Sequence, residues 1–245
     1  MKFGIQLYNF RRFLAEDFEG TMQKISQLGF EGAEVVVYRG PLTPAEYAAY
    51  LQKLNLQCCG AMYEPARLTD PSDSAYEYVK AMKSPAVTIS SWSENFASEW
   101  QQQAELLQKI GQAAAANGVV FSYHNHWDEC VKVDGDAALC RMLDANDPAQ
   151  VFAEPDICWL NRGGLNAAEF ITRYAGRIKQ VHFKDIRIAD DIKTTVPLGT
   201  GIIDLKSAYQ AAKAANVEWI IYEQDNSGDP FADAAQSLEY LKQLQ

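Results

Sequence analysis

The sequence predicts one α/β domain over residues 1–245, folded as a (β/α)8 TIM barrel. Three observations lead to this fold class. Short runs rich in β-branched or aromatic residues alternate with longer segments whose apolar residues recur at helical spacing. Eight such runs occur, which is the number of strands in this kind of barrel. No Pro/Ser-rich linker and no block of like charge divides the chain.

The expected strands are short and spread along the whole chain. In order they are Phe3–Tyr8, Ala33–Val37, Gln57–Met62, Ala86–Ser90, Val119–Tyr123, Val151–Glu154, Gln180–Phe183 and Trp219–Tyr222. Between them, apolar residues recur every three or four positions, as at Leu107, Ile110 and Ala114. This spacing is typical of a helix that buries one face.

Several helix ends can be read from single residues. Thr43, followed by Pro44 and by Glu46, has the pattern of a helix start with a reciprocal cap. Gly29 and Asn216 each stand just before an expected strand and tolerate the left-handed conformation that often ends a helix.

An open, doubly wound parallel sheet is the rival architecture. Such sheets usually carry a glycine-rich turn for phosphate after the first strand. Here residues 8–12 follow the first expected strand without a glycine, and this favours the barrel.

The charge balance excludes polyanionic partners. The 245 residues include 22 basic and 32 acidic side chains, for a formal net charge of −10. Such a chain gains nothing from counterion release on DNA or RNA, and an anionic membrane surface would repel it. We therefore expect neither a nucleic acid nor a membrane as a partner.

The compartment is inferred from targeting and cysteine patterns. The apolar start of the chain meets Arg11 and Arg12 almost at once, which is unlike a signal peptide, and the longest apolar runs are of strand length. The five cysteines show no metal-ligand spacing, and the adjacent pair Cys58–Cys59 is a poor start for disulfides. We expect reduced thiols and a cytoplasmic protein.

Titratable residues gather where the expected strands end. These are Glu34 in the second strand, His124 and His126 after the fifth, Asp156 after the sixth, His182 in the seventh and Glu223 after the eighth. Singly, each carboxylate could cap a helix and His182 could be a rim residue. Since all strands of a barrel end at one mouth, the set indicates a site there. Imidazole and carboxylate ligands without thiolate suit Mn²⁺, Mg²⁺, Co²⁺ or Zn²⁺.

Six motifs in order resemble one known family. They are Gly29–Glu34, Tyr123–Glu129, Asp156–Trp159, His182–Asp185, Leu198–Gly201 and Tyr222–Asp225. Over essentially its whole length the chain resembles the xylose-isomerase-like TIM barrel family, the sugar phosphate isomerases and epimerases, in its Tyr-His-Asn-His subgroup. The Leu198–Gly201 loop is no phosphate-binding signature, so the phosphate in the family name is not transferred.

The resemblance implies one divalent cation held by residues after the fifth to eighth strands. Manganese is the first expectation, with Co, Mg, Zn or Ni as alternatives. Asp156, His182 and Glu223 match three of the family's ligands. The fourth is expected to be Glu129, with His124, which stands where many epimerases have Glu, as the alternative.

The resemblance also implies residues that contact substrate, namely Glu34, His126, Trp159 and Lys184. Trp159 stands where epimerases typically have a histidine and suits stacking on a sugar ring. Lys184 suits stabilisation of an enolate or binding of a hydroxyl, and a surface salt bridge with Asp185 is the alternative.

The implied chemistry is proton abstraction beside a carbonyl through a metal-bound enediolate. Glu223 is the expected base, and Glu129 or His124 acts on the opposite face. We expect a metal-dependent sugar isomerase or epimerase. One alternative is a lyase or dehydratase that acts by β-elimination on a keto-sugar, 3-keto-glycoside or inosose. Another is a non-catalytic sugar-binding barrel. The expected partner is a small carbohydrate, and a homo-oligomer remains open.

Overall fold

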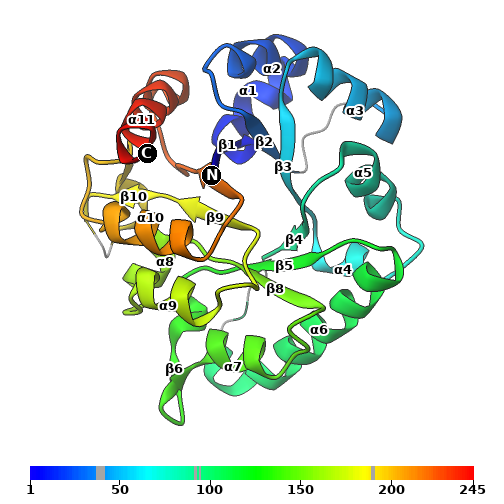
Figure 1. Ribbon diagram of the computed structural model, residues 1–245, viewed down its shortest axis with the longest axis vertical. Coiled ribbons are helices and arrows are strands. Elements are labelled where there is room, and N and C mark those ends of the chain that lie inside the picture. The colour runs from blue at the N-terminus through cyan, green and yellow to red at the C-terminus, as the bar shows by residue number, and fades with distance from the viewer. Residues whose placement is uncertain (37–41, 91–92, 94, 189–190) are drawn as a thin grey trace.

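The computed structural model describes residues 1–36, 42–90, 93, 95–188 and 191–245. Eight parallel strands form one curved sheet in the order β8-β5-β4-β3-β2-β1-β12-β9, with the helices arranged around it (Figure 1). The predicted (β/α)8 barrel is confirmed. That the limits of the domain coincide with residues 1 and 245 stays a prediction.

All eight predicted strands are present. They are β1 Lys2–Gln6, β2 Gly32–Val35, β3 Gln57–Met62, β4 Val87–Ile89, β5 Phe121–His124, β8 Val151–Glu154, β9 Gln180–Phe183 and β12 Trp219–Tyr222. The first strand ends two residues early, since the Gln6 side chain accepts the Tyr8 N–H and turns residues 7–10 into a 3-10 helix. Val37, the predicted end of the second strand, lies outside the described residues.

Eleven helices are described: α1 Arg11–Glu16, α2 Phe18–Ser26, α3 Pro44–Lys53, α4 Pro65–Leu68, α5 Ala75–Met82, α6 Phe96–Ala116, α7 Ala138–Asp144, α8 Ile157–Arg162, α9 Ala167–Arg173, α10 Leu205–Ala214 and α11 Pro230–Leu244. The predicted cap is confirmed, because the Thr43 N–H donates to Glu46 Oε2 and the Glu46 N–H donates to Thr43 Oγ1. Gly29 and Asn216 have the predicted left-handed conformation, with φ of 96° and 55°. None of the described helices is both long and apolar enough to cross a membrane.

Shorter elements lie around the mouth of the barrel. They are the 3-10 helices η1 Leu7–Phe10, η2 Asp128–Cys130 and η3 Ile192–Thr194, and two hairpins, β6 Lys132–Val133 with β7 Asp136–Ala137 and β10 Asp185–Ile186 with β11 Thr195–Val196. These elements follow β1, β5 and β9, so they add loops at the carboxyl ends of the strands.

The barrel closes between β8 and β9 through two isolated parallel bridges, Ala153 with Ile178 and Asp156 with His182. The Ala153 N–H donates to the Arg177 carbonyl at 2.8 Å, and the His182 N–H donates to the Pro155 carbonyl at 2.9 Å. The second bridge places Asp156 and His182 at the same height in the barrel.

The interior of the barrel contains a buried polar layer, made of Gln6, Glu34, Thr88, Glu154 and Gln180. None of these side chains is more than 1% exposed. Thr88 Oγ1 and Gln180 Nε2 donate to Glu154 Oε2 at 2.5 and 2.9 Å, and Gln6 Nε2 donates to Glu34 Oε2 at 2.6 Å. Gly60 makes room for this layer, because a Cβ there would overlap the Glu34 carboxylate.

Candidate active site

A cavity of about 360 Å³ opens at the carboxyl ends of the strands. Its lining includes His124, His126, Trp159, Lys184 and Glu223, all singled out from the sequence. The predicted mouth of the barrel therefore coincides with a concave site. Tyr8, Arg11 and Asp225 also line the cavity, although none of them was predicted from sequence as a site residue.

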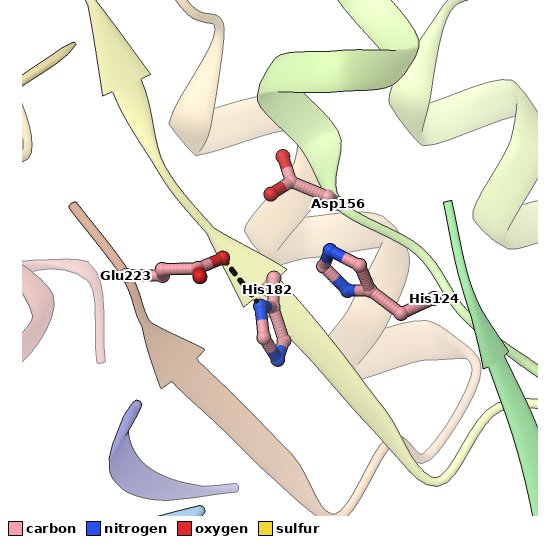
Figure 2. A group of neighbouring side chains, drawn as sticks. All are labelled: His124, Asp156, His182 and Glu223. Atoms are coloured by element: carbon pink, nitrogen blue, oxygen red, sulfur yellow. Dashed lines mark hydrogen bonds and ion pairs between the residues drawn. The ribbon is translucent and has the colours of Figure 1, made fainter. Parts of the chain in front are cut away.

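Four side chains at the base of this cavity could share one metal ion. Ligand atoms of His124, Asp156, His182 and Glu223 all lie within 4.8 Å of one another, and all four residues are buried (Figure 2). His124 ends β5, Asp156 follows β8, His182 lies in β9 and Glu223 follows β12. The parallel order of these strands turns four distant positions into one group.

Asp156 caps a helix and also belongs to this group. Its Oδ1 accepts the N–H groups of Cys158 and Trp159 at 2.9 and 3.0 Å, at the start of α8. Its Oδ2 lies 3.0 Å from Lys184 Nζ. Burial raises the pKa of Asp156 to about 6, although Lys184 opposes the rise. The capping alternative considered from sequence is thus correct for one oxygen and leaves the other facing the mouth.

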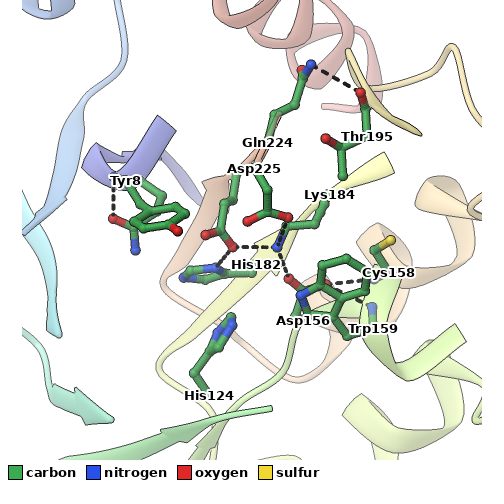
Figure 3. A network of polar contacts seen from close by, with 12 residues as sticks. Tyr8, His124, Asp156, Cys158, Trp159, His182, Lys184, Thr195, Gln224 and Asp225 are labelled. Carbon is green, nitrogen blue, oxygen red and sulfur yellow. Dashed lines mark hydrogen bonds and ion pairs between the residues drawn. The ribbon is translucent and has the colours of Figure 1, made fainter. Parts of the chain in front are cut away.

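Lys184 is the electrostatic centre of the mouth (Figure 3). It is 1% exposed, and its Nζ lies 3.0 Å from Asp156 Oδ2, 2.9 Å from Glu223 Oε2 and 3.0 Å from Asp225 Oδ2. It also lies 4.4 Å from the centre of a Trp159 ring. Burial disfavours the ammonium, but the carboxylates outweigh it and raise the pKa of Lys184 well above its usual range.

Lys184 therefore contacts the cavity and three carboxylates, whereas Asp185 has a separate task. Asp185 Oδ2 accepts the N–H groups of Gly199 and Gly201 at 3.0 and 2.8 Å, which fixes the Leu198–Gly201 loop. A Cβ on Gly201 would overlap Asp185 Oδ1, so this close approach requires glycine.

Glu223 is ionised in this setting. Burial raises the pKa of its carboxyl, but the charge of Lys184 and a hydrogen bond with His182 outweigh burial and hold the pKa well below its usual range. His182 Nδ1 lies 2.9 Å from Glu223 Oε2. The result is a carboxylate that lines the cavity and carries its charge at neutral pH.

His182 also contacts the buried polar layer. Its Nε2 lies 2.6 Å from both Glu34 Oε2 and Glu154 Oε1. One N–H cannot neutralise two carboxylates, and burial raises the pKa of Glu34 to about 8, so Glu34 keeps its proton at neutral pH. Glu34, expected to bind substrate, lies below His182 and does not appear among the residues that line the mouth cavity.

The structure groups His124, and not Glu129, with the other three candidate ligands. Glu129 is buried in η2, where its Oε1 accepts the Tyr123 hydroxyl at 2.8 Å and the His126 N–H at 3.1 Å. Burial raises the pKa of Glu129 to about 7. The sequence left this choice open, because Glu129 stands five residues beyond the strand and its direction depends on those contacts.

His124 and His126 are neutral at pH 7. Burial lowers the pKa of His124 well below its usual range and that of His126 to about 4. The Nδ1 of His124 is buried without a hydrogen-bond partner among the described residues, and the nearest carboxylate oxygen in an ion pair, Glu154 Oε1, is 3.9 Å away. A neutral imidazole with an unsatisfied nitrogen, next to two carboxylates, fits a divalent metal ion.

Two tryptophans form the aromatic wall of the cavity. Trp127 and Trp159 both line it, and their rings meet edge to face with centroids 4.9 Å apart. Trp159 therefore lies where a ring of the substrate could stack, as the sequence suggested, although Lys184 approaches the same indole.

A parallel eight-stranded barrel with imidazoles and carboxylates grouped at its carboxyl mouth defines the class of barrel proteins that can hold a divalent metal ion. A family model described as xylose isomerase-like TIM barrel matches residues 22–244. The chain belongs to this family, which confirms the resemblance seen in the sequence.

Comparisons with individual proteins agree with this assignment. An inosose dehydratase from Clostridium botulinum (strain Alaska E43 / Type E3) is 26% identical over 272 residues, covering 92% of this chain and 89% of that protein. A sugar phosphate isomerase/epimerase from Parabacteroides distasonis ATCC 8503 superimposes with a TM-score of 0.81 at 17% identity, over 98% of this chain and 93% of that one.

Two further structures share the fold. The probable 3-DHS dehydratase AsbF of Bacillus anthracis has a TM-score of 0.78 at 15% identity, with 99% of both chains covered. The IolI protein with a bound zinc atom has a TM-score of 0.78 at 12% identity, over 100% of this chain and 98% of that one. The curated relatives reported for this chain are inosose dehydratases, so the family includes enzymes.

Proposed function

We propose that this protein is a divalent-metal-dependent carbohydrate dehydratase, which removes water by β-elimination from an inosose, keto-sugar or 3-keto-glycoside. Isomerisation or epimerisation was the first expectation from sequence, and the relatives support its dehydratase alternative better. A small carbohydrate as substrate, a homo-oligomer and a cytoplasmic location remain proposals.

The position of Glu129 favours elimination over epimerisation. Epimerisation needs a proton-transfer group on each face of the reacting carbon. Glu129, the expected second group, is turned away and held by Tyr123 and the His126 N–H. Among the described residues that line the cavity, the carboxylates are Glu223 and Asp225, and both contact Lys184. The carboxylates that could accept a proton therefore lie on one side of the cavity, where both contact Lys184.

Elimination can use that one side alone. The Glu223 carboxylate accepts the proton beside the carbonyl, the C–H electron pair forms the C=C bond, and the C–O bond to the neighbouring hydroxyl breaks. The proton on Glu223 then passes to the departing oxygen and completes a water molecule. The Lys184 ammonium, 2.9 Å from Glu223 Oε2, stabilises the negative charge that develops next to it.

His124, Asp156, His182 and Glu223 would hold the metal ion. Bound there, a divalent ion supplies Lewis-acid polarisation of a carbonyl and stabilises negative charge on its oxygen. Manganese is our first proposal for the ion, and the zinc in the IolI structure supports a divalent metal in this fold.

An epimerase is the second candidate, favoured by one observation. His126 lines the cavity and is neutral, with its pKa lowered to about 4 by burial, so it can accept or return a proton on another side of the substrate.

A proton-exchange screen tests the proposal. The protein, loaded with substoichiometric Mn²⁺, is incubated in D₂O with ketoses, 3-keto-glycosides and inososes, and the products are read by NMR. We expect an unsaturated, dehydrated product from one of these classes. Glu223→Gln should lower the rate by about 10²–10⁴. Deuterium incorporation with inversion at one carbon and no dehydrated product would instead establish the epimerase.

A further inference from the structure

A second cavity of about 480 Å³ adjoins the mouth. It lies between the start of the chain, η3 and the loop after β12, and its lining includes Asn9, Arg11, Arg12 and Lys193. Arg11, Asp225 and Asn226 line both cavities, so the second one continues the space in which the substrate would react. A molecule seated over Glu223 could extend into it.

The charge around this second cavity is positive, in contrast to the net charge of −10 for the chain. Arg11, Arg12 and Lys193 line it, against the carboxylates of Glu16 and Asp225. The Asp225 carboxylate is already paired with Lys184 at 3.0 Å. Within the described part of the chain, no ion pair is found for Arg12 or Lys193.

Arg11 is held in place by neutral groups. Its Nη1 donates to the Tyr8 carbonyl and its Nη2 to the Asp225 carbonyl, both at 3.0 Å, and its guanidinium lies 4.1 Å from the centre of the Tyr8 ring. These contacts fix the side chain without neutralising its charge. A cation fixed in advance loses little side-chain entropy when an anion binds.

Asn9 offers a donor that nothing in the described chain uses. Its Oδ1 accepts the Gln224 N–H at 2.9 Å, which sets the orientation of the amide. The side chain is 9% exposed and lines the cavity, and its Nδ2 is buried without a hydrogen-bond partner among the residues described. Since buried donors in proteins are nearly always bonded, this one indicates an acceptor from a ligand.

We infer that the second cavity is a subsite for an anionic group, a carboxylate or phosphate, carried by the substrate away from its reacting carbons. Three cations and one amide N–H without a partner outnumber the two carboxylates, of which Asp225 is already paired with Lys184. Such an excess of positively charged donors favours an anion over a neutral sugar. The inference rests on the proposed function for the idea that a substrate occupies the mouth. It deepens that proposal by naming the charge of the substrate.

Calorimetric titration tests the subsite without turnover. The purified protein is titrated with D-glucose 6-phosphate, D-glucuronate, D-glucose and inorganic phosphate at low ionic strength. We expect the two anionic sugars to bind more tightly than D-glucose and than inorganic phosphate. Arg12→Ala and Lys193→Ala should each lower the affinity for the two anionic sugars by roughly tenfold, since each removes a charge-assisted contact. The control Lys213→Ala, which removes an exposed charge on α10, should leave the affinities unchanged.

Three results would overturn the inference. They are equal affinity for anionic and neutral sugars, equal loss in the Lys213→Ala control, and inorganic phosphate binding as tightly as the sugar phosphate. The last would indicate a site for a free anion. Because calorimetry measures binding without reaction, a negative result in the dehydratase assay would not change the binding result. In the same way, a negative binding result would not change the result of the dehydratase assay.

Discussion

Replacing Lys184 with methionine would leave the carboxylates of Asp156, Glu223 and Asp225 in a buried site without their shared cation. Removal of one partner from a buried ion pair destabilises a protein by about 3–5 kcal/mol. Burial already raises the pKa of Asp156 to about 6, so protonation of that carboxyl limits the loss. We expect a decrease of about 3 kcal/mol in the free energy of unfolding for Lys184→Met, taking the lower end of this range.

The same substitution should change the response to metal. A divalent ion would bind two of the carboxylates that Lys184 contacts, so it can replace part of the lost charge compensation. Urea unfolding of both proteins at pH 7.5, followed by circular dichroism, is measured with a chelator and then with Mn²⁺. Mn²⁺ should return more stability to Lys184→Met than it adds to the unsubstituted protein.

Lys242→Met is the matched control. It removes an exposed ion pair, Lys242 Nζ to Glu239 Oε1 at 2.7 Å, which is worth about 1 kcal/mol at most. In a chain of this length, a loss of about 3 kcal/mol lowers Tm by roughly 6–12 °C. This decrease is larger than the decrease in Tm expected for Lys242→Met. If Lys184→Met lost no more than Lys242→Met, the electrostatic account of the mouth would be refuted.

Three further predictions follow from the same contacts. His124→Ala should lower bound metal, read by elemental analysis, well below one equivalent, whereas Glu129→Gln should retain it; the reverse pattern would make Glu129 the ligand. Gly60→Ala should lower stability by about 1–3 kcal/mol and weaken Mn²⁺ binding, because its Cβ would overlap Glu34; an unchanged Mn²⁺ titration would contradict this. Burial raises the pKa of Glu129 to about 7, so the contribution of its protonated carboxyl to stability is complete below about pH 4.5 and is lost as pH rises to about 7. In urea titrations at several pH values, Glu129→Gln should therefore show a smaller decrease in the free energy of unfolding over this range. Equal decreases in the two proteins would contradict the prediction.

The barrel could be predicted because its signals are local. Most residues of the barrel strands are buried, as in β12, which consists of Trp219, two isoleucines and Tyr222. The cap at Thr43 depends on residues within one helical turn. The strand ends were less certain, since the Gln6 side chain stops β1 through a hydrogen bond to the Tyr8 N–H that no periodicity shows. The two-residue strands, such as β6 Lys132–Val133, are too short to have a pattern.

The residues of the candidate site likewise fall into those that local sequence signals predict and those that only the fold brings together. Asp156, His182 and Glu223 could be found because each stands at or just after a strand end, and all such ends meet at one mouth. The direction of the Glu129 side chain is set by the Tyr123 hydroxyl and the His126 N–H, and residue spacing does not reveal these contacts. The sequence therefore predicted Glu129 as the fourth ligand and kept His124 only as the alternative. The cations of the second cavity lie on separate segments, and only the fold brings them together.

The contacts of His182 show how the mouth of the barrel depends on the buried polar layer. A histidine that binds metal through one nitrogen is oriented by what its other nitrogen contacts. Here Nδ1 faces Glu223 at the mouth, and Nε2 contacts Glu34 and Glu154 in the buried polar layer. Glu154 stands two residues before Asp156, so strand alternation gives both side chains the same face, with Asp156 nearer the carboxyl end of the strand. The geometry of the candidate metal group therefore depends on Glu34 and Glu154, two buried carboxyls that are not among the residues that line the mouth cavity.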